Sequence, residues 1–130
     1  MISTDLLEYQ AAALTNKARA EAGLRPLIID GGLTSLARLK SGDMRARGYC
    51  GHESPVYGSP FDMLNRYGIN YHHAAENVAM GFETPEAVMN SWMESPAHKK
   101  NILNKRYERI GVGAAKDTNG ALYWTQLFIG

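Results

Sequence analysis

The residues with the clearest chemical potential fall in three short strings of the chain. They are residues 51–55 with His52, residues 75–78 with Glu76, and residues 95–98 with His98. Neutral imidazole and carboxylate groups can together hold a divalent cation, or they can exchange protons with a ligand. Their spacing matches no generic zinc pattern such as His-Glu-x-x-His. A hydrogen-bonded network that pins loops to a sheet is therefore the competing interpretation.

The local context of each residue indicates how it would be presented. Glycines and a proline around His52 favour an exposed loop, whereas Glu76 leads directly into an expected core strand, where a buried bare charge is costly. We expect Glu76 to meet a cation, or to accept hydrogen bonds from His52 or His98. His98 is the third residue of a helix that Ser95 is expected to cap, and the positive end of that helix disfavours imidazolium. Glu94, just before the cap, is either a second carboxylate of the site or solvated surface.

Other reactive or aromatic residues have simpler structural interpretations. His72 and His73 precede the strand and are expected in a surface loop, although one of them could border the same cleft. Cys50 is alone, so it forms no intrachain disulfide, and we expect a small buried hydrophobe rather than half of a Cys/His catalytic pair. Trp92 and Trp124 are expected in the core, with sugar stacking as the alternative.

Length and composition predict one globular domain spanning residues 1–130. The chain is 45% hydrophobic with a formal net charge of +1, which does not favour a nucleic-acid partner, since such proteins show a clustered basic face. No stretch approaches the roughly 18 apolar residues of a transmembrane segment, and residues 1–5 do not read as a signal peptide. Phosphate-binding glycine loops and the Gly-x-Ser-x-Gly hydrolase motif are also missing from the sequence.

Helical periodicity and capping signals predict five helices. Glycines end the first two, and the pairs Ser59-Pro60, Thr84-Pro85 and Ser95-Pro96 open three short ones. The expected ranges are 4–22, 32–47, 60–67, 85–93 and 96–103.

In the last third of the chain, the pattern of apolar residues changes from the helical period to a period of two. Residues 110–114 alternate, Asn119-Gly120 predicts a hairpin turn, and residues 122–129 are apolar on both faces. Residues 77–80 supply a third strand, while residues 24–29 are expected as an extended connection. Helices on both faces of this sheet predict an α+β fold, a three-layer α-β-α sandwich around a small, mainly antiparallel sheet.

These segments together resemble the CAP superfamily, which joins cysteine-rich secretory proteins, antigen 5 and plant pathogenesis-related proteins. The similarity covers residues 6–129 and is closest to the bacterial branch often called SCP-like. Its most specific strings are GHESP (51–55), GSPF (58–61), AENVA (75–79), WMESPAH (92–98), NILN (101–104), IGVG (110–113) and YWTQ (123–126).

The resemblance implies an α-β-α sandwich and a cleft with two histidines and two glutamates, which in several members binds a divalent cation, commonly zinc. Matched by motif, these are His52, His98 and Glu76, with Glu94 as the nearest candidate for the second glutamate. Family members are mostly secreted, and the roles proposed for them include lipid or sterol binding, defence, protein inhibition and signalling. The resemblance therefore implies an extracellular or cell-envelope location.

The sequence leads to one main functional prediction and two alternatives. We expect a secreted or envelope-associated, non-catalytic domain in which His52, Glu76 and His98 bind a divalent cation, zinc above all, or a small or lipid ligand. The first alternative is a metal-assisted hydrolase of peptide or cell-wall material, in which Glu76 or Glu94 moves the proton. The second is a scaffold that presents loops to a protein partner.

Overall fold

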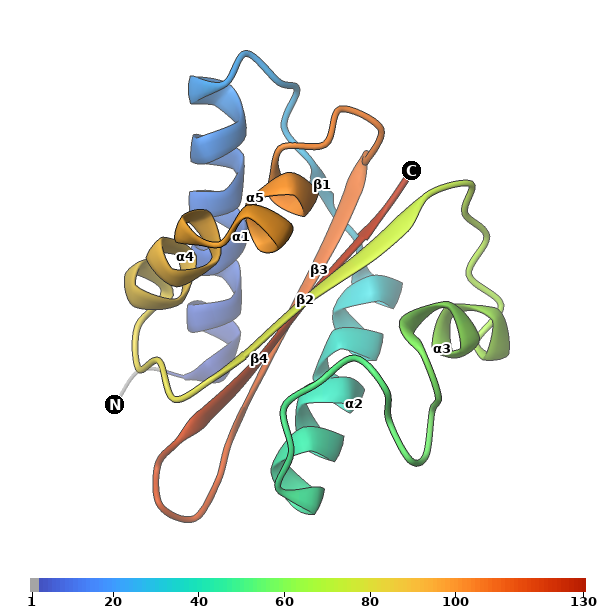
Figure 1. The fold of residues 1–130 in the computed structure, drawn as a ribbon, viewed down its shortest axis with the longest axis vertical. Helices are drawn as coiled ribbons and strands as arrows, with labels where there is room; N and C mark the ends of the chain where they lie inside the picture. Colours follow the sequence, from blue (N-terminus) through green and yellow to red (C-terminus); the bar gives the residue numbers. More distant parts are fainter. Residues whose placement is uncertain (1–2) are drawn as a thin grey trace.

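A four-stranded sheet separates two layers of helices in the computed structural model, which describes residues 3–130 (Figure 1). The elements, in chain order, are α1 (Thr4–Glu21), β1 (Ile28–Ile29), α2 (Gly31–Arg47), α3 (Pro60–Arg66), β2 (Ala74–Met80), α4 (Pro85–Glu94), α5 (Pro96–Ile102), β3 (Arg109–Lys116) and β4 (Leu122–Ile129). Met1 and Ile2 lie outside the described residues. They are the first residues of the predicted domain and of the segment 1–5, which was not expected to be a signal peptide. Within residues 3–130, no helix combines the length and apolar character needed to cross a bilayer.

The strand order is β1-β3-β4-β2, so β2 is an edge strand. β4 pairs antiparallel with both β3 and β2, which confirms the predicted antiparallel hairpin. The sheet is nevertheless mixed, because β1 pairs parallel with β3 through Ile28 and Ile29. This strand was expected only as an extended connection. It is too short for a period of two, and both isoleucines are exposed, so nothing in the pattern marks it as a strand.

Helices α1, α4 and α5 cover one face of the sheet, and α2 and α3 cover the other (Figure 1). Alternate residues of β4 enter the two resulting cores: Trp124 and Phe128 pack under α1 and α4, and Leu127 packs against α2. Trp92 and Trp124 are both buried, and their indole N–H groups donate to backbone carbonyls. The three-layer sandwich and the core role of both tryptophans are as predicted.

Local capping signals explain where most helices begin. Ser59 and Asp62 form the reciprocal capping box of α3, and the Asp30 side chain accepts from the Leu33 amide at the start of α2. Helix α1 is capped by Ser3, whose side chain accepts from the Leu6 amide. Ser95 precedes α5 as expected, but its hydroxyl makes no capping hydrogen bond.

Two glycines of β3 let α2 lie directly on the sheet. A Cβ atom built on Gly111 would lie 2.3 Å from the backbone carbon of Leu33, and one on Gly113 would lie 2.3 Å from that of Ala37. These distances are far below van der Waals contact, so any side chain at either position would push α2 away. The position of α2 matters because this helix carries two residues that hold the loop with His52.

Candidate functional site

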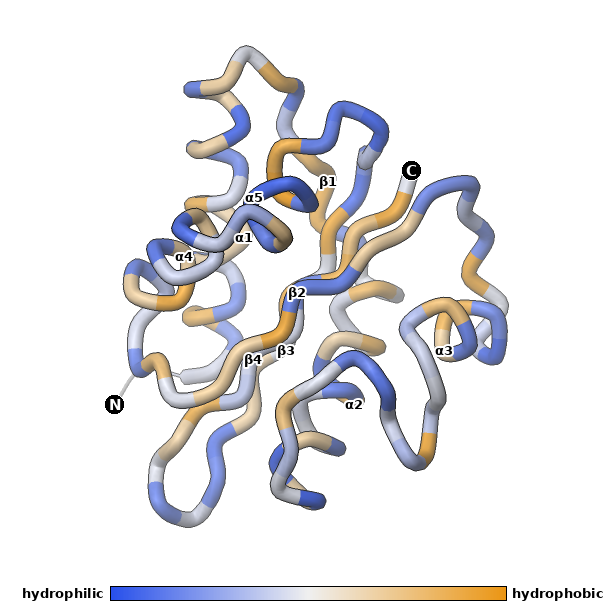
Figure 2. Tube along the Cα trace, viewed as in Figure 1, coloured by the Kyte–Doolittle hydropathy of each residue, from blue (hydrophilic) through white to orange (hydrophobic). Residues whose placement is uncertain are grey.

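The candidate site is built on the middle of the edge strand β2. Figure 2 shows a hydrophilic segment there, between apolar ones, and it corresponds to Glu76 and Asn77. Side chains of consecutive strand residues point to opposite faces. Glu76 accordingly meets residues from the α2 layer, and Asn77 meets residues from α5. This strand therefore ties together segments from both helical layers.

Glu76 and His52 form a direct pair. Oε1 of Glu76 lies 2.9 Å from Nδ1 of His52, and the Glu76 side chain is 1% exposed against 56% for His52. The hydrogen bond to Glu76 raises the pKa of His52 above its ordinary value, although burial acts in the opposite direction. The other carboxylate oxygen, Oε2, is the one buried side-chain nitrogen or oxygen of residues 3–130 that has no hydrogen-bond partner.

Lys40 of α2 lies beneath this pair and was not among the predicted site residues. Its ammonium group donates to the backbone carbonyl of His52 at 2.6 Å and lies 3.7 Å from Oε1 of Glu76. The side chain is 2% exposed, so the positive charge compensates the buried carboxylate and fixes the loop at the same time. A signal for Lys40 was present in the sequence: it continues the apolar stripe of α2 that includes Leu36 and Ala37, where a lysine is exceptional.

Asp43, one helical turn after Lys40, holds the rest of this loop. Its carboxylate accepts from the hydroxyl of Tyr49, from Ser54 Oγ at 2.7 Å and from Arg47 Nε at 2.8 Å. Burial alone would raise the pKa of Asp43, but these three donors lower it overall. Burial and the hydrogen bond to Asp43 raise the pKa of Tyr49 to about 12.

The prediction that Cys50 is buried is wrong. We expected a buried thiol, and the structure places Cys50 exposed in the same loop. The neighbouring Tyr49 provides the inward contact by bonding Asp43, which leaves the next residue on the outside. The loop packs through hydrogen bonds rather than through apolar side chains.

An amide network fixes α5 against the other side of β2. Nδ2 of Asn77 donates to the His98 carbonyl at 3.2 Å and to Oε1 of Gln126 at 3.0 Å. Asn101 donates to Oδ1 of Asn77 at 2.8 Å, and Gln126 donates to Thr15 of α1 at 2.7 Å. Such connected buried amides orient the segments they join. The network was not predicted, because single Asn and Gln residues give no pattern in a sequence.

His98 is partly buried at the start of α5. Burial lowers its pKa, and the positive charge of His52 lowers it further. The expected direction is therefore found, although the causes are burial and the second histidine. The lowered pKa favours neutral imidazole at His98.

The structure joins the His52 and Glu76 side chains and ties the His98 backbone to the next residue of the same strand, Asn77, whereas Glu94 makes none of these contacts. Glu94 is the exposed last residue of α4. In the described part of the chain, no three His, Cys, Asp or Glu side chains are grouped closely enough to hold a metal ion together. A metal site formed by His52, Glu76 and His98 stays a prediction.

A cleft of about 750 Å³ opens beside the His52–Glu76 pair. It runs between the segment around α3 and the segment that follows α5. Both His72 and His73, expected in a surface loop, are exposed and border it, whereas His98 and Glu94 are not among its lining residues. The lining residues are His52, Glu53, Ser59, Pro60, Phe61, Tyr71, His72, His73, Ala74, Ala75, Glu76, Lys100, Asn101, Asn104, Arg106 and Tyr107.

Comparison with known proteins supports a family assignment. The profile described as "Cysteine-rich secretory protein family" (CAP) matches residues 12–128. The chain is 48% identical over 128 residues to YkwD of Bacillus subtilis, which covers 98% of this chain and 49% of YkwD. It is 34% identical over 122 residues to the membrane protein YlbC of the same organism, covering 94% of this chain and 34% of YlbC. The chain thus spans about half or less of these two relatives.

Solved structures show the same fold. An extracellular protein with an SCP domain from Bacillus anthracis superposes with a TM-score of 0.87 at 29% identity, covering 99% of this chain and 44% of that one. An outer surface protein from Borrelia burgdorferi gives a TM-score of 0.89 at 23% identity, covering 98% of this chain and 95% of that one. At 23% identity, the similarity to the Borrelia burgdorferi protein shows a shared fold only.

Proposed function

The chain belongs to the cysteine-rich secretory protein (CAP) family, and on this premise we propose that it is a ligand-binding domain that holds a divalent cation between His52 and His98. Zinc is the cation we expect, because imidazole nitrogen is among its preferred ligands. The observation that carries the proposal is the hydrogen bond between Oε1 of Glu76 and Nδ1 of His52.

This hydrogen bond is the kind of support that metal-binding histidines have. A carboxylate that accepts from one ring nitrogen fixes the orientation of the imidazole and leaves the other nitrogen available for a metal. Nε2 of His52 is the available nitrogen here, on a ring that is more than half exposed. The neutral ring favoured at His98 is the form that ligates metals.

The Oε2 atom of Glu76, beside this pair, has no hydrogen-bond partner. A buried carboxylate oxygen without a donor is rare and calls for a missing partner such as water or an ion. With two imidazoles as the protein ligands, other coordination positions would be left to water or to a ligand. A bound zinc would supply a Lewis-acidic centre to which an oxygen or nitrogen atom of that ligand could attach.

Binding is favoured over the alternative of a metal-assisted hydrolase. That mechanism requires a carboxylate that is free to move a proton. Glu76 is buried, hydrogen-bonded to His52 and close to Lys40, and Glu94 lies exposed at the end of α4 rather than in the cleft. Neither glutamate has the freedom that the hydrolytic role demands.

Zinc titration by calorimetry tests the proposal. We expect one zinc per chain at pH 7.5, at least a tenfold weaker affinity in His98→Ala, and a loss of about tenfold in Glu76→Gln. His72→Ala is the matched control, since His72 borders the cleft without being a proposed ligand, and it should bind as the wild type does. No heat with the wild type, or equal affinities for wild type and His98→Ala, would refute the metal site.

We further propose that the domain works outside the cell or at its envelope, on a small-molecule, lipid or cell-wall ligand. The support comes from two proteins of the same fold, since the Bacillus anthracis protein is described as extracellular and the Borrelia burgdorferi protein as an outer surface protein. Fractionation of the native producing cells with an antibody to this chain would test the location. Recovery from the cytosol alone would contradict it.

A further inference from the structure

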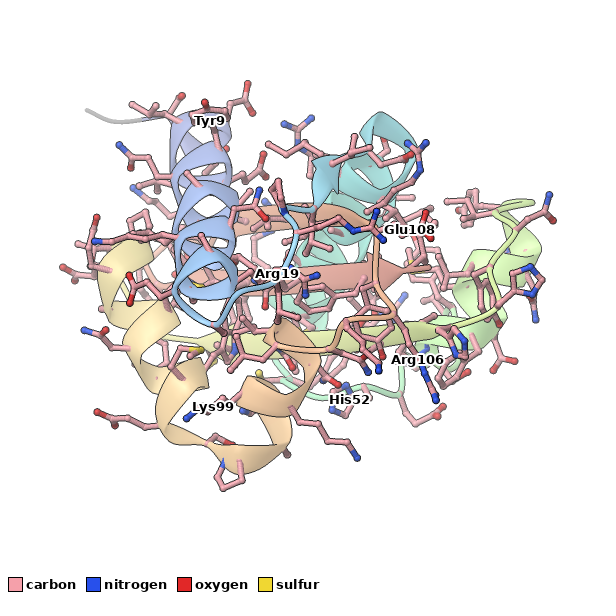
Figure 3. The ribbon with its side chains drawn as sticks, turned by 90° about the horizontal axis from the view of Figure 1, so that it is seen from above. Tyr9, Arg19, His52, Lys99, Arg106 and Glu108 are labelled. Carbon is pink, nitrogen blue, oxygen red and sulfur yellow. The ribbon has the colours of Figure 1, made fainter. Side chains whose placement is uncertain are left out.

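Positively charged side chains line the cleft that opens beside the His52–Glu76 pair. They are Lys100 of α5 and Arg106 of the following segment, and His72 and His73 border the cleft as well. The segment that carries Arg106 is hydrophilic, as Figure 2 shows. In Figure 3, Arg106 and His52 extend on the same side of β2. A ligand that enters the cleft therefore meets several cationic or protonatable groups.

Backbone contacts place Arg106 and His73 next to each other. The Gly130 amide donates to the His73 carbonyl at 2.9 Å, and the Gly130 carbonyl accepts from the His73 amide at 2.8 Å. A Cβ atom on Gly130 would lie 1.8 Å from the carbonyl oxygen of Arg106. Gly130 thus packs between the two backbones, and the Arg106 amide is also fixed by Asn104 Oδ1 at 2.9 Å. The backbones that carry these two side chains are held in place.

These cations are not neutralised by the protein. Among the ion pairs of residues 3–130, neither Lys100 nor Arg106 takes part. Two carboxylates line the cleft, and one of them, Glu76, is already compensated by Lys40 and His52. Glu53 is the other, and it is exposed to solvent. The unpaired charge in the cleft is therefore mainly positive.

Aromatic rings provide an apolar wall in the same cleft. Phe61 and Tyr71 lie with their ring centroids 6.2 Å apart, and Phe61 is 47% exposed. Tyr107, which is largely buried and stacks on Phe128 at 5.5 Å, also lines the cleft. An exposed phenylalanine ring beside unpaired cations can accept the apolar or ring-bearing part of a charged ligand.

We propose that this cleft binds a small organic anion, with its carboxylate or phosphate group at Arg106 and its apolar or ring portion against Phe61 and Tyr71. The proposal rests on the proposed function in one respect, namely that this cleft is the ligand site. It uses other residues than the metal site does. The anion-site proposal and the metal-site proposal can therefore be refuted independently of each other.

The test uses phenyl phosphate and benzoate as probes. The control compounds are inorganic phosphate, which has no ring, and benzyl alcohol, which has no charge. Binding is followed at pH 7 in the presence of a chelator by NMR shifts of the amides of residues 71–76 and 104–107. We expect phenyl phosphate or benzoate to bind more tightly than inorganic phosphate and benzyl alcohol. The tighter of the two anions identifies the preferred head group.

Arg106→Gln should weaken binding of the preferred probe about tenfold, because it removes a charge-assisted hydrogen bond. Lys99→Gln is the matched control: Lys99 is an exposed cation of α5 that does not line the cleft, so the affinity should not change. His98→Ala should lose zinc but keep the anion, and Arg106→Gln should do the reverse. Equal weakening by Arg106→Gln and Lys99→Gln, equal affinity for benzyl alcohol and benzoate, or anion binding only in the presence of zinc would each overturn the proposal.

Discussion

Oε1 of Glu76 lies 2.9 Å from Nδ1 of His52, although the two residues are separated by 24 positions and come from an edge strand and a loop. The carboxylate is buried and the imidazole is more than half exposed, so the pair connects the protein interior to the cleft. Its consequences for charge, loop position and stability can be measured separately.

Replacing Glu76 with glutamine should lower the pKa of His52. The hydrogen bond to Glu76 is the main cause that raises this pKa, and a neutral amide stabilises imidazolium much less. Titration of the His52 ring protons by NMR, in a chelator, measures the change. Glu53→Gln is the control and should have a much smaller effect, since Glu53 is the weakest contributor. An unchanged His52 titration in Glu76→Gln would contradict the pairing.

Replacing Lys40 with methionine should destabilise the protein by about 3 kcal/mol, because it leaves the carboxylate of Glu76 buried without its ammonium partner. Urea unfolding measures the loss, and Lys99→Met, at an exposed position, should change stability by less than about 0.5 kcal/mol. The double variant Lys40→Met/Glu76→Gln should lose less than the sum of the single variants, since both charges are then gone. Strict additivity would show that the two groups do not interact.

Replacing Gly113 with alanine should cost about 3 kcal/mol, since the added methyl group would collide with the backbone of Ala37 and separate α2 from β3. Gly31→Ala is the control, because a Cβ atom there meets nothing within 4 Å. Thermal and urea unfolding of both variants gives the comparison. A Gly113→Ala protein as stable as Gly31→Ala would mean that the helix lies farther from the sheet.

Asp43 should make stability depend on pH in the acid range. Its pKa is lower in the folded protein than the ordinary value of 3.8, so the stabilisation is complete above that value and is lost as pH falls through the folded-state pKa. Asp43→Asn should therefore be less stable at pH 7, by about 1–2 kcal/mol, and lose less on acidification than the wild type. Urea unfolding between about pH 5 and pH 2 checks this. Parallel curves for the two proteins would exclude Asp43 as the cause.

Much of the fold could be predicted from the sequence because its signals are local. Proline after a capping hydroxyl marks the starts of α3, α4 and α5, and Gly48, in a left-handed conformation, ends α2 where expected. The apolar runs on both faces of β4 indicated helices on both sides of the sheet. The strand β1 was missed because two exposed isoleucines show no periodicity, and its pairing with β3 is a long-range contact.

The candidate site, too, could be predicted from the sequence only in part. Its most visible members, His52, Glu76 and His98, stand in recognisable strings, and their residue types alone indicated a cation or a hydrogen-bonded network. Lys40, Asp43 and Asn77 lie inside ordinary helix and strand sequences, and what they hold comes from distant segments. Likewise, nothing in the sequence distinguishes Glu94, exposed on α4, from a carboxylate that reaches the cleft.

The sequence by itself determined the elements other than β1, the layers and the set of reactive side chains, because capping, periodicity and turn formation depend on residues within a few positions of one another. Only the tertiary structure decided which of those side chains meet, how Glu76 is compensated and where unpaired positive charge gathers. These properties depend on distances between segments far apart in the chain, and those distances are set by how α2 packs against β3 and β4 and how α5 packs against β2.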